Sequence, residues 1–334
     1  MGSLLSVPVT EQQSGETKGD FLDCGYTSMQ GWRRTMEDAH IVDVEFTCEN
    51  GKKASFFGVF DGHGGDQVAE YCSKIYVETL LNTDAFKAGN YQQALIDTNI
   101  KIDEQMRTPA VNDLLKTLGS GSSNIYDGMF GDLVADGMGC TSVVILIIDN
   151  TIYCGNAGDS RSVMLKGDNV IPLSVDHKPS LQSEIDRITL AGGTIDNGRV
   201  NGNLNLTRTI GDLMYKRQSE LPPQSQIISC YPDITQQAMD GTEKLIILAC
   251  DGIWDVLTNE QCVEKVLEYL KQGNSLKETC EKIANDCLSK EPYSKPGWDN
   301  MTLLVVKFKS FNPQPDTTTV VASSQEKDEG SVTK

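Results

Sequence analysis

The chain has 334 residues, 39% of them hydrophobic, and a formal net charge of −18 at pH 7. This length and composition can bury a large core, and we expect one main domain. The charge argues against a general binder of nucleic acid or anionic membranes, because such surfaces would repel the chain, and it suits the binding of divalent cations.

Ten cysteines occur without a CxxC pair or regular spacing. This usage is typical of reduced, buried thiols in an intracellular protein, and it predicts neither a disulfide framework nor a zinc site. No apolar stretch is long enough to span a bilayer, and no cleavable signal peptide is visible. We expect a cytoplasmic protein, with the nucleus and a membrane-associated fraction left open.

Residues 1–20 are polar and lack aromatic side chains, which predicts a flexible N-terminal segment. The first residues, MGSLLS, match the N-myristoylation pattern, with Gly2 as the acceptor. Such short patterns also recur by chance, so acylation stays open. One acyl chain would give only weak, reversible membrane association.

The stretch VFDGHGG at 59–65 follows an apolar run and raises a choice between a tight structural turn and a ligand site. A helix is expected after its glycines, because apolar and small residues then recur at helical spacing. The residues on that helix face are Val68, Tyr71, Cys72, Ile75 and Thr79.

Residues 117–139 are glycine-rich with little periodicity and predict a long surface loop, whereas the rest of the middle alternates strand pairs with helices. TSVVILIIDNTIYCGNAG and RSVMLKGDNVIPLS have the form of hairpins. EKLIILAC and MTLLVVKF are apolar runs typical of strands buried on both faces.

Two helix starts are marked by capping boxes, Thr258 with Gln261 and Ser275 with Glu278. Residues 312–334 have the composition of a disordered C-terminal tail. Hairpins with helices between them predict an α+β fold of mostly antiparallel sheets flanked by helices.

Acidic residues recur at the ends of the predicted strands. In antiparallel neighbours the end of one strand lies beside the start of the next, so these carboxylates would meet at one edge and require a cation. At any single position, ordinary turn chemistry is an equal alternative. The positions are Asp61, Asp159, Asp251 and Asp299, with the adjacent pair Glu37 and Asp38 ahead of another strand.

Oxygen ligands favour Mg²⁺ or Mn²⁺, and the three scattered histidines do not form a zinc triad. The nearest EF-hand lookalike, DGMFGDLVADGM, has Asp132 where the loop needs glycine and Met138 where it needs glutamate. No phosphate-binding GxxxxGK[ST] loop occurs.

Eight segments in order closely resemble the metal-dependent protein serine/threonine phosphatases of type 2C, the PPM family. They are GWRRTMEDAH, FFGVFDGHGG, GCTSVV, NAGDSRSVM, DHKPS, RVNGNLNLTRTIGD, LACDGIWDVL and WDNMTLLVV. The resemblance covers about residues 25–308 and implies a phosphatase domain at 21–311. The implied fold is a four-layer αββα sandwich of two antiparallel β-sheets flanked by helix pairs.

The resemblance also implies two Mg²⁺ or Mn²⁺ ions, which share a water that attacks phosphorus without a phosphoenzyme intermediate. Asp61 matches the carboxylate that bridges the ions and acts in catalysis, and Gly62 matches a ligand through its carbonyl. Glu37, Asp251 and Asp299 match acidic residues that bind the two ions directly or through water, and Asp38 matches a neighbouring carboxylate in the surrounding shell. Asp159 and Asp255 match residues that, together with Asp251, are associated with a weaker third ion in some members.

Arg33 matches the arginine that binds the substrate phosphate, and His63 matches the proposed general acid. Thr141 and Asn300 match polar residues around the metal cluster, where a mainly structural role is an equal alternative. Three further polar residues are expected to fix loops without doing chemistry, and His40 to be structural. The three are Lys178, Arg208 and Asp212.

The implied activity is hydrolysis of phosphoserine and phosphothreonine in proteins by a monomer that binds no nucleic acid. Two alternatives are a catalytically dead relative that binds phosphoproteins and a metal-binding structural protein. Dead relatives usually lose a metal carboxylate, whereas this chain retains Glu37, Asp61, Asp251 and Asp299. The sequence therefore favours the enzyme.

Overall fold

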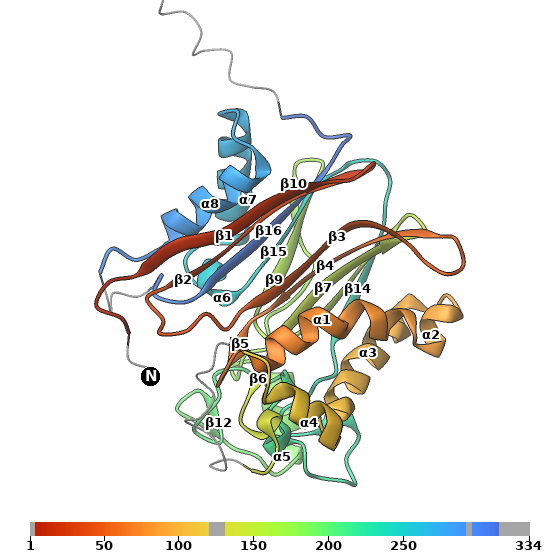
Figure 1. The fold of residues 1–334 in the computed structure, drawn as a ribbon, viewed down its shortest axis with the longest axis vertical. Helices are drawn as coiled ribbons and strands as arrows, with labels where there is room; N and C mark the ends of the chain where they lie inside the picture. The colour runs from red at the N-terminus through yellow and green to blue at the C-terminus, as the bar shows by residue number, and fades with distance from the viewer. Residues whose placement is uncertain (1–3, 120–130, 292–295, 314–334) are drawn as a thin grey trace, which may run out of the picture.

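Two antiparallel sheets lie face to face in the computed structural model, which describes residues 4–119, 131–291 and 296–313 (Figure 1). The first sheet has six strands in the order β1 (Val9–Lys18), β2 (Leu22–Gly31), β16 (Met301–Phe308), β15 (Glu243–Ala249), β9 (Arg161–Lys166) and β10 (Asn169–Pro172). The second has five, in the order β14 (Asp233–Ala238), β8 (Thr151–Ala157), β7 (Ser142–Ile148), β4 (Lys53–Phe60) and β3 (Ala39–Thr47).

Helices cover the outer face of each sheet, so the chain forms the four layers that the sequence predicts (Figure 1). The helices on the side of the five-stranded sheet are α1 (Gln67–Leu81), α2 (Asp84–Lys87), α3 (Tyr91–Gln105) and α4 (Pro109–Leu115). Those on the side of the six-stranded sheet are α6 (Asp251–Trp254), α7 (Asn259–Lys271) and α8 (Leu276–Cys287).

Three apolar clusters fill the spaces between these layers. Successive side chains of a strand point to opposite faces, and in β4 Phe56 packs toward α1 while its neighbour Phe57 packs between the sheets. Both phenylalanines are fully buried. The apolar runs of the central strands therefore reflect burial on two faces, as expected, although all the pairings are antiparallel.

A small third sheet lies at one end of the sandwich. It has the order β13 (Ile210–Gly211), β6 (Gly139–Cys140) and β5 (Gly62–His63), and β5 follows directly from β4 through Asp61. The 3₁₀ helix η2 (Val134–Asp136) leads into β6. The range 117–139, predicted to be a long loop, therefore contains η2 and the first residue of β6 in its described part.

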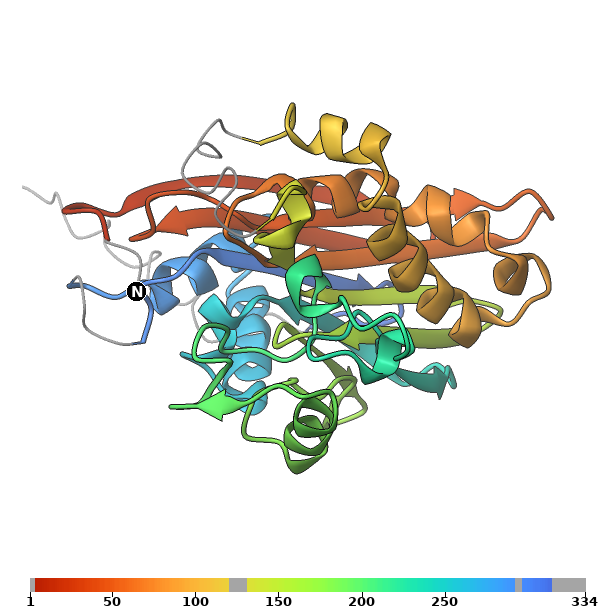
Figure 2. The same cartoon turned by 90° about the horizontal axis from the view of Figure 1, so that it is seen from below.

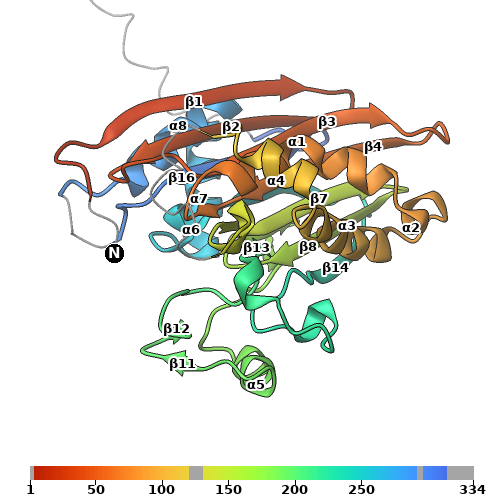
Figure 3. The same ribbon diagram turned by 60° about the horizontal axis from the view of Figure 1, so that its bottom comes forward.

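Residues 177–230 form a segment with its own small core, which we call the lateral segment. It contains α5 (Gln182–Leu190), β11 (Ile195–Asp196), β12 (Arg199–Val200), η3 (Leu213–Tyr215) and η4 (Pro223–Ser225). Figure 3 shows α5 and β11–β12 extending away from the sandwich. Although α4 and α5 overlap in Figure 1, Figure 2 shows them at opposite margins of the molecule.

The expectation of a flexible segment at 1–20 is wrong for Val9–Lys18, which forms the edge strand β1. Its polar composition reflects exposure at an edge, while its backbone pairs with β2 along most of its length. The side chain of Gln12 also donates to the Glu281 carbonyl and the Asn285 amide oxygen on α8. Gly2 and residues 314–334 lie outside the described residues.

The predicted helix after VFDGHGG is α1, with Val68, Tyr71, Cys72 and Thr79 among its buried residues. All ten cysteines are buried free thiols, as expected. Within the described ranges, no helix combines the length and the apolarity needed to cross a membrane.

Candidate active site

Carboxylates from both sheets converge at one end of the sandwich. Ala39 at the start of β3 pairs with Phe60 at the end of β4, which brings Glu37 and Asp38 beside Asp61. Ala249 at the end of β15 pairs with Leu303 near the start of β16, which brings Asp251 beside Asp299. The antiparallel pairing expected from the sequence thus creates this cluster.

Asp38 and Asp61 lie at the centre of the cluster, where each offers an oxygen within 4.8 Å of the other and of the Cys250 sulfur. Asp38 Oδ2 accepts a hydrogen bond of 2.7 Å from Thr302 Oγ1, whereas its buried Oδ1 has no partner in the described chain. Burial, reinforced by the charge of Asp299, raises the pKa of Asp38 to about 7 despite the Thr302 bond. A buried carboxylate oxygen without a donor fits a site for a cation.

The pKa values of Asp61 and Asp251 are also raised well above the usual range. For Asp61, burial is the main cause, followed by the charges of Asp38, Asp251, Asp299 and Asp159. For Asp251, burial is again followed by neighbouring aspartates, with Asp159 first. These carboxylates destabilise one another's ionised forms, as expected of a cluster that requires positive charge.

Two glycines let neighbouring backbone segments lie close together beside the cluster. A Cβ on Gly62 would lie 2.2 Å from the Glu37 carbonyl oxygen, and a Cβ on Gly252 would lie 1.9 Å from the Asn300 carbonyl oxygen. Real Cβ atoms do not come this close to oxygen, so both positions require glycine. Asp61 and Asp251, which precede these glycines, can therefore lie against the strand starts that carry the other carboxylates.

Asn300 and Thr141 hold the backbone around the cluster. Asn300 Oδ1 accepts from the Glu37 amide at 3.0 Å, and its Nδ2 donates to the carbonyls of Gln30 and Thr35 at 2.8 and 2.9 Å. Thr141 Oγ1 accepts from the Asp61 amide at 3.0 Å. Both side chains form hydrogen bonds to backbone groups, and these bonds favour the mainly structural role that the sequence left as an alternative.

Arg33 is the exposed cation next to the cluster. Its Nη2 donates to Asp299 Oδ2 at 2.5 Å, and its side chain is 47% exposed. Burial lowers its pKa, but the charge of Asp299, followed by those of Asp61 and Asp251, raises it overall. The remaining guanidinium N–H groups form no hydrogen bond with the described residues and are able to bind an anion.

His63 bonds a buried aspartate that the sequence did not connect with it. Its Nε2 lies 2.7 Å from Asp212 Oδ2, and the side chain of Asp212 is 3% exposed. Burial is the largest single effect and would lower the pKa of His63, but the charge and hydrogen bond of Asp212, together with the charges of Glu37 and Asp159, raise the pKa overall. Burial would raise the pKa of Asp212, but the charge and hydrogen bond of His63, with the Thr209 hydrogen bond and the charge of Lys216, together lower it.

Asp159 and Asp255, the residues matched to a third ion, lie in different surroundings. Asp159 is buried, and its Oδ2 accepts from Lys178 Nζ at 2.7 Å. Asp255 is exposed at the end of α6 and lines a pocket of about 180 Å³ that also contains Asp299. Lys178 therefore contacts a site carboxylate directly, beyond the loop-fixing role expected of it.

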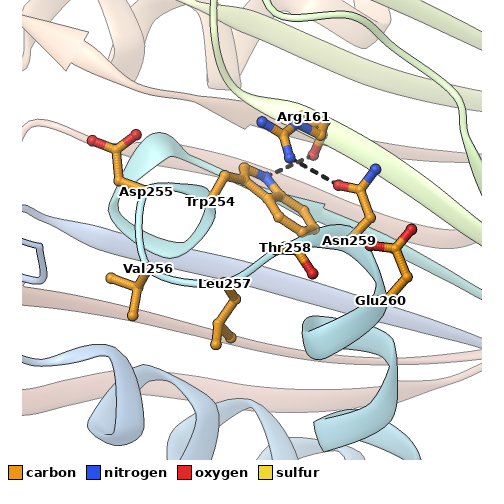
Figure 4. A pocket seen from close by; sticks show the side chains of 8 residues that line it. All are labelled: Arg161, Trp254, Asp255, Val256, Leu257, Thr258, Asn259 and Glu260. Atoms are coloured by element: carbon orange, nitrogen blue, oxygen red, sulfur yellow. Dashed lines mark hydrogen bonds between the residues drawn. The ribbon is translucent and has the colours of Figure 1, made fainter.

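A second pocket borders Asp255 on its other side (Figure 4). Arg161 lies over the ring of Trp254, and Asp255 points away from both. The indole of Trp254 is buried and donates to the Ala249 carbonyl at 2.8 Å. Trp254 is therefore a core residue.

The donor set fits a hard divalent cation. The one sulfur among the central groups, Cys250, is held as a thiol because burial and the charge of Asp38 raise its pKa well above the usual range. Its Sγ also donates to the Asn300 carbonyl at 3.4 Å. The remaining groups are carboxylate and carbonyl oxygens, which Mg²⁺ and Mn²⁺ prefer.

Comparisons with known proteins identify the family and agree with this fold. The family model of Protein phosphatase 2C matches residues 22–293. Probable protein phosphatase 2C 21 of Arabidopsis thaliana is 38% identical over 340 residues, with 94% of each chain covered. Protein phosphatase 2C homolog 2 of Schizosaccharomyces pombe is 41% identical over 312 residues, covering 92% of this chain and 79% of the relative.

The crystal structure of serine-threonine phosphatase 2C from Toxoplasma gondii has a similar fold. Its TM-score is 0.71 at 21% identity, and the match covers 92% of this chain and all of that one. The chain belongs to the protein phosphatase 2C family. It is accordingly a protein serine/threonine phosphatase, and the family is metal-dependent.

Proposed function

We propose that this chain hydrolyses phosphoserine and phosphothreonine in proteins with two Mg²⁺ or Mn²⁺ ions bound by the carboxylate cluster. The observation that carries the proposal is the buried Asp38 Oδ1, which lacks a donor beside the repelling carboxylates of Asp61 and Asp251. When bound, such ions supply an activated water and neutralise charge on the phosphoryl oxygens.

In this proposal the cluster residues act as ligands that position the ions, and they donate or accept no proton during the reaction. Asp61 is fixed through its backbone by Thr141 and is the proposed bridging ligand. Gly62 is a proposed ligand through its carbonyl. The other proposed ligand carboxylates are Glu37, Asp251 and Asp299, with Asp38 beside them. Asp159 and Asp255 are the proposed ligands of a third, more weakly bound ion.

Arg33 is the proposed phosphate-binding residue. A guanidinium forms paired hydrogen bonds to phosphate oxygens and so fixes the direction of attack. Its exposure and its single bond to Asp299 support this role, because the outer part of the guanidinium faces solvent. Because every phosphoester substrate carries the phosphate group that Arg33 would bind, loss of this side chain is expected to raise KM for all of them.

His63 is the proposed general acid. A serine or threonine oxygen is a poor leaving group and requires a proton as its bond to phosphorus breaks. His63 lies two residues beyond Asp61, at the end of β5, with 25% of its side chain exposed. The ring can thus contact both the enzyme interior and a bound phosphoester.

The test is phosphate release from a phosphothreonine peptide with and without Mn²⁺. We expect activity to depend on added Mn²⁺ or Mg²⁺, to disappear in EDTA and to persist in okadaic acid. Calorimetric titration with Mn²⁺ alone provides a second readout. Full activity in EDTA after exhaustive dialysis would refute the metal mechanism, whereas Mn²⁺ binding without turnover would show that the chain binds metal but lacks catalysis.

A further inference from the structure

The third sheet brings His63 and Asp212 together across its middle strand. His63 ends β5, Asp212 directly follows β13, and both flanking strands pair with β6 at Gly139. A Cβ on Gly139 would lie 2.4 Å from Asp212 Oδ2 and 3.0 Å from His63 Nε2. Only a residue without a side chain leaves room for the two groups to meet at this position.

Asp212 is held in place by several independent contacts. Its amide donates to the Met138 carbonyl at 2.8 Å, and the Thr209 hydroxyl donates to its Oδ2 at 2.7 Å. Its φ of 50° lies in the left-handed region, which residues other than glycine adopt at a cost. Because the surrounding contacts hold Asp212 in this costly backbone conformation, they also fix the direction of its carboxylate.

The hydrogen bond also determines which ring nitrogen of His63 is free. Nε2 is the atom that faces Asp212, and Nδ1 has no hydrogen-bond partner among the described residues. A carboxylate accepts but cannot donate, so Nε2 must carry hydrogen, and Nδ1 is the nitrogen left to face a substrate. Contacts of this kind fix both the tautomer and the orientation of an imidazole.

We propose that Asp212 is the positioning residue for His63, orienting the ring so that Nδ1 delivers the proton to the leaving group. The inference rests on the proposed role of His63. As the P–O bond breaks, its electron pair passes to the serine or threonine oxygen, which takes the proton from Nδ1. The imidazole becomes neutral and retains its Nε2–H bond to Asp212.

The kinetic test is a double-mutant cycle of Asp212→Ala and His63→Gln at saturating Mn²⁺. Asp212→Ala should lower kcat on a phosphothreonine peptide by about 10–10²-fold, less than or equal to the smallest loss typical of removing a general acid, about 10²-fold. The loss should be much smaller on p-nitrophenyl phosphate, whose leaving group needs no proton. Adding Asp212→Ala to His63→Gln should cause no further loss, because the aspartate acts through the histidine.

The matched control is Asp103→Asn. Asp103 is buried and accepts from the Gly211 amide at 2.9 Å and from Lys216 Nζ at 2.5 Å, so it holds the same stretch of chain. It forms no hydrogen bond or ion pair with His63. Its replacement should change turnover on the two substrates by equal factors, as expected of a structural role.

Nitrogen NMR of the imidazole provides a readout that does not depend on activity. With His63→Gln used for assignment, wild-type His63 should carry hydrogen on Nε2 in its neutral form, and Asp212→Ala should abolish this preference. A neutral ring protonated on Nδ1 in the wild type would overturn the inference, as would additive kinetic losses in the double mutant. Equal losses on both substrates for His63→Gln would instead refute the general-acid role itself, and the proposed role of Asp212 in proton delivery with it.

Discussion

Glu184 is the buried anion that holds the lateral segment together, and its neutralisation should destabilise the protein strongly. Its Oε1 accepts from Arg208 Nη2 at 2.7 Å, and its Oε2 accepts from Arg187 Nη2 and Thr207 Oγ1, both at 2.6 Å. The residue is 1% exposed. Glu184→Gln preserves its shape but leaves two guanidinium groups without their shared counter-charge.

The expected magnitude follows from the pKa of this carboxyl. Burial alone would raise it, but the hydrogen bond from Arg208 and the charge of Arg187 lower the pKa from the usual 4.5 to about 2. This lowering corresponds to roughly 3 kcal/mol of stability. Because the folded-state pKa is depressed, the contribution is fully present above pH 4.5 and is lost as the pH falls toward 2.

Urea denaturation in EDTA measures the effect without contributions from metal binding. At pH 7, Glu184→Gln should lower the free energy of unfolding by about 3 kcal/mol, and the difference from wild type should shrink below pH 4.5. The exposed Glu220, in the same segment, provides the control Glu220→Gln, which should change stability by less than about 0.5 kcal/mol. A loss in Glu184→Gln that stays constant from pH 7 to pH 3 would contradict this account of the network.

Gly62→Ala should abolish Mn²⁺ binding measured by calorimetry and lower the melting temperature, because its Cβ would overlap the Glu37 carbonyl oxygen. Unchanged binding would place the ions elsewhere. Asp61→Asn should lower turnover by about 10²-fold or more and weaken Mn²⁺ binding, yet leave the melting temperature in EDTA unchanged or higher, since repulsion is relieved. A lower melting temperature in EDTA would argue against that repulsion. Lys178→Met should lower the melting temperature more in EDTA than in Mn²⁺, because it leaves Asp159 without its ammonium partner; equal losses would show that no cation compensates Asp159.

Local signals in the sequence were sufficient for much of the fold. The capping boxes at Thr258 and Ser275 mark the starts of α7 and α8 because each side chain bonds a backbone amide three residues away. Strand β1 carried no such signal. Its stability comes from pairing with β2, and an exposed edge strand needs few apolar residues, so composition alone suggested disorder.

The carboxylate cluster was predictable because strand ends are visible in a sequence and antiparallel pairing joins them. The partner of His63 was not, since Asp212 lies 149 residues away along the chain and reaches it through a three-stranded sheet of two-residue strands. The only sequence signals were the Gly-Asp pair of TRTIGD and the glycine at position 139. Neither indicates which residue it faces.

The position of β16 has a consequence for the protein as it is synthesised. This strand is the last among the described residues but lies between β2 and β15 in the middle of its sheet. Asp299 and Asn300 immediately precede it. A nascent chain on the ribosome therefore lacks this strand, the Asp299 carboxylate and the Asn300 amide that fixes Glu37 until residues 299–308 have been synthesised. The growing polypeptide cannot assemble this site from its N-terminal strands alone, so dephosphorylation can begin only after β16 has joined its sheet.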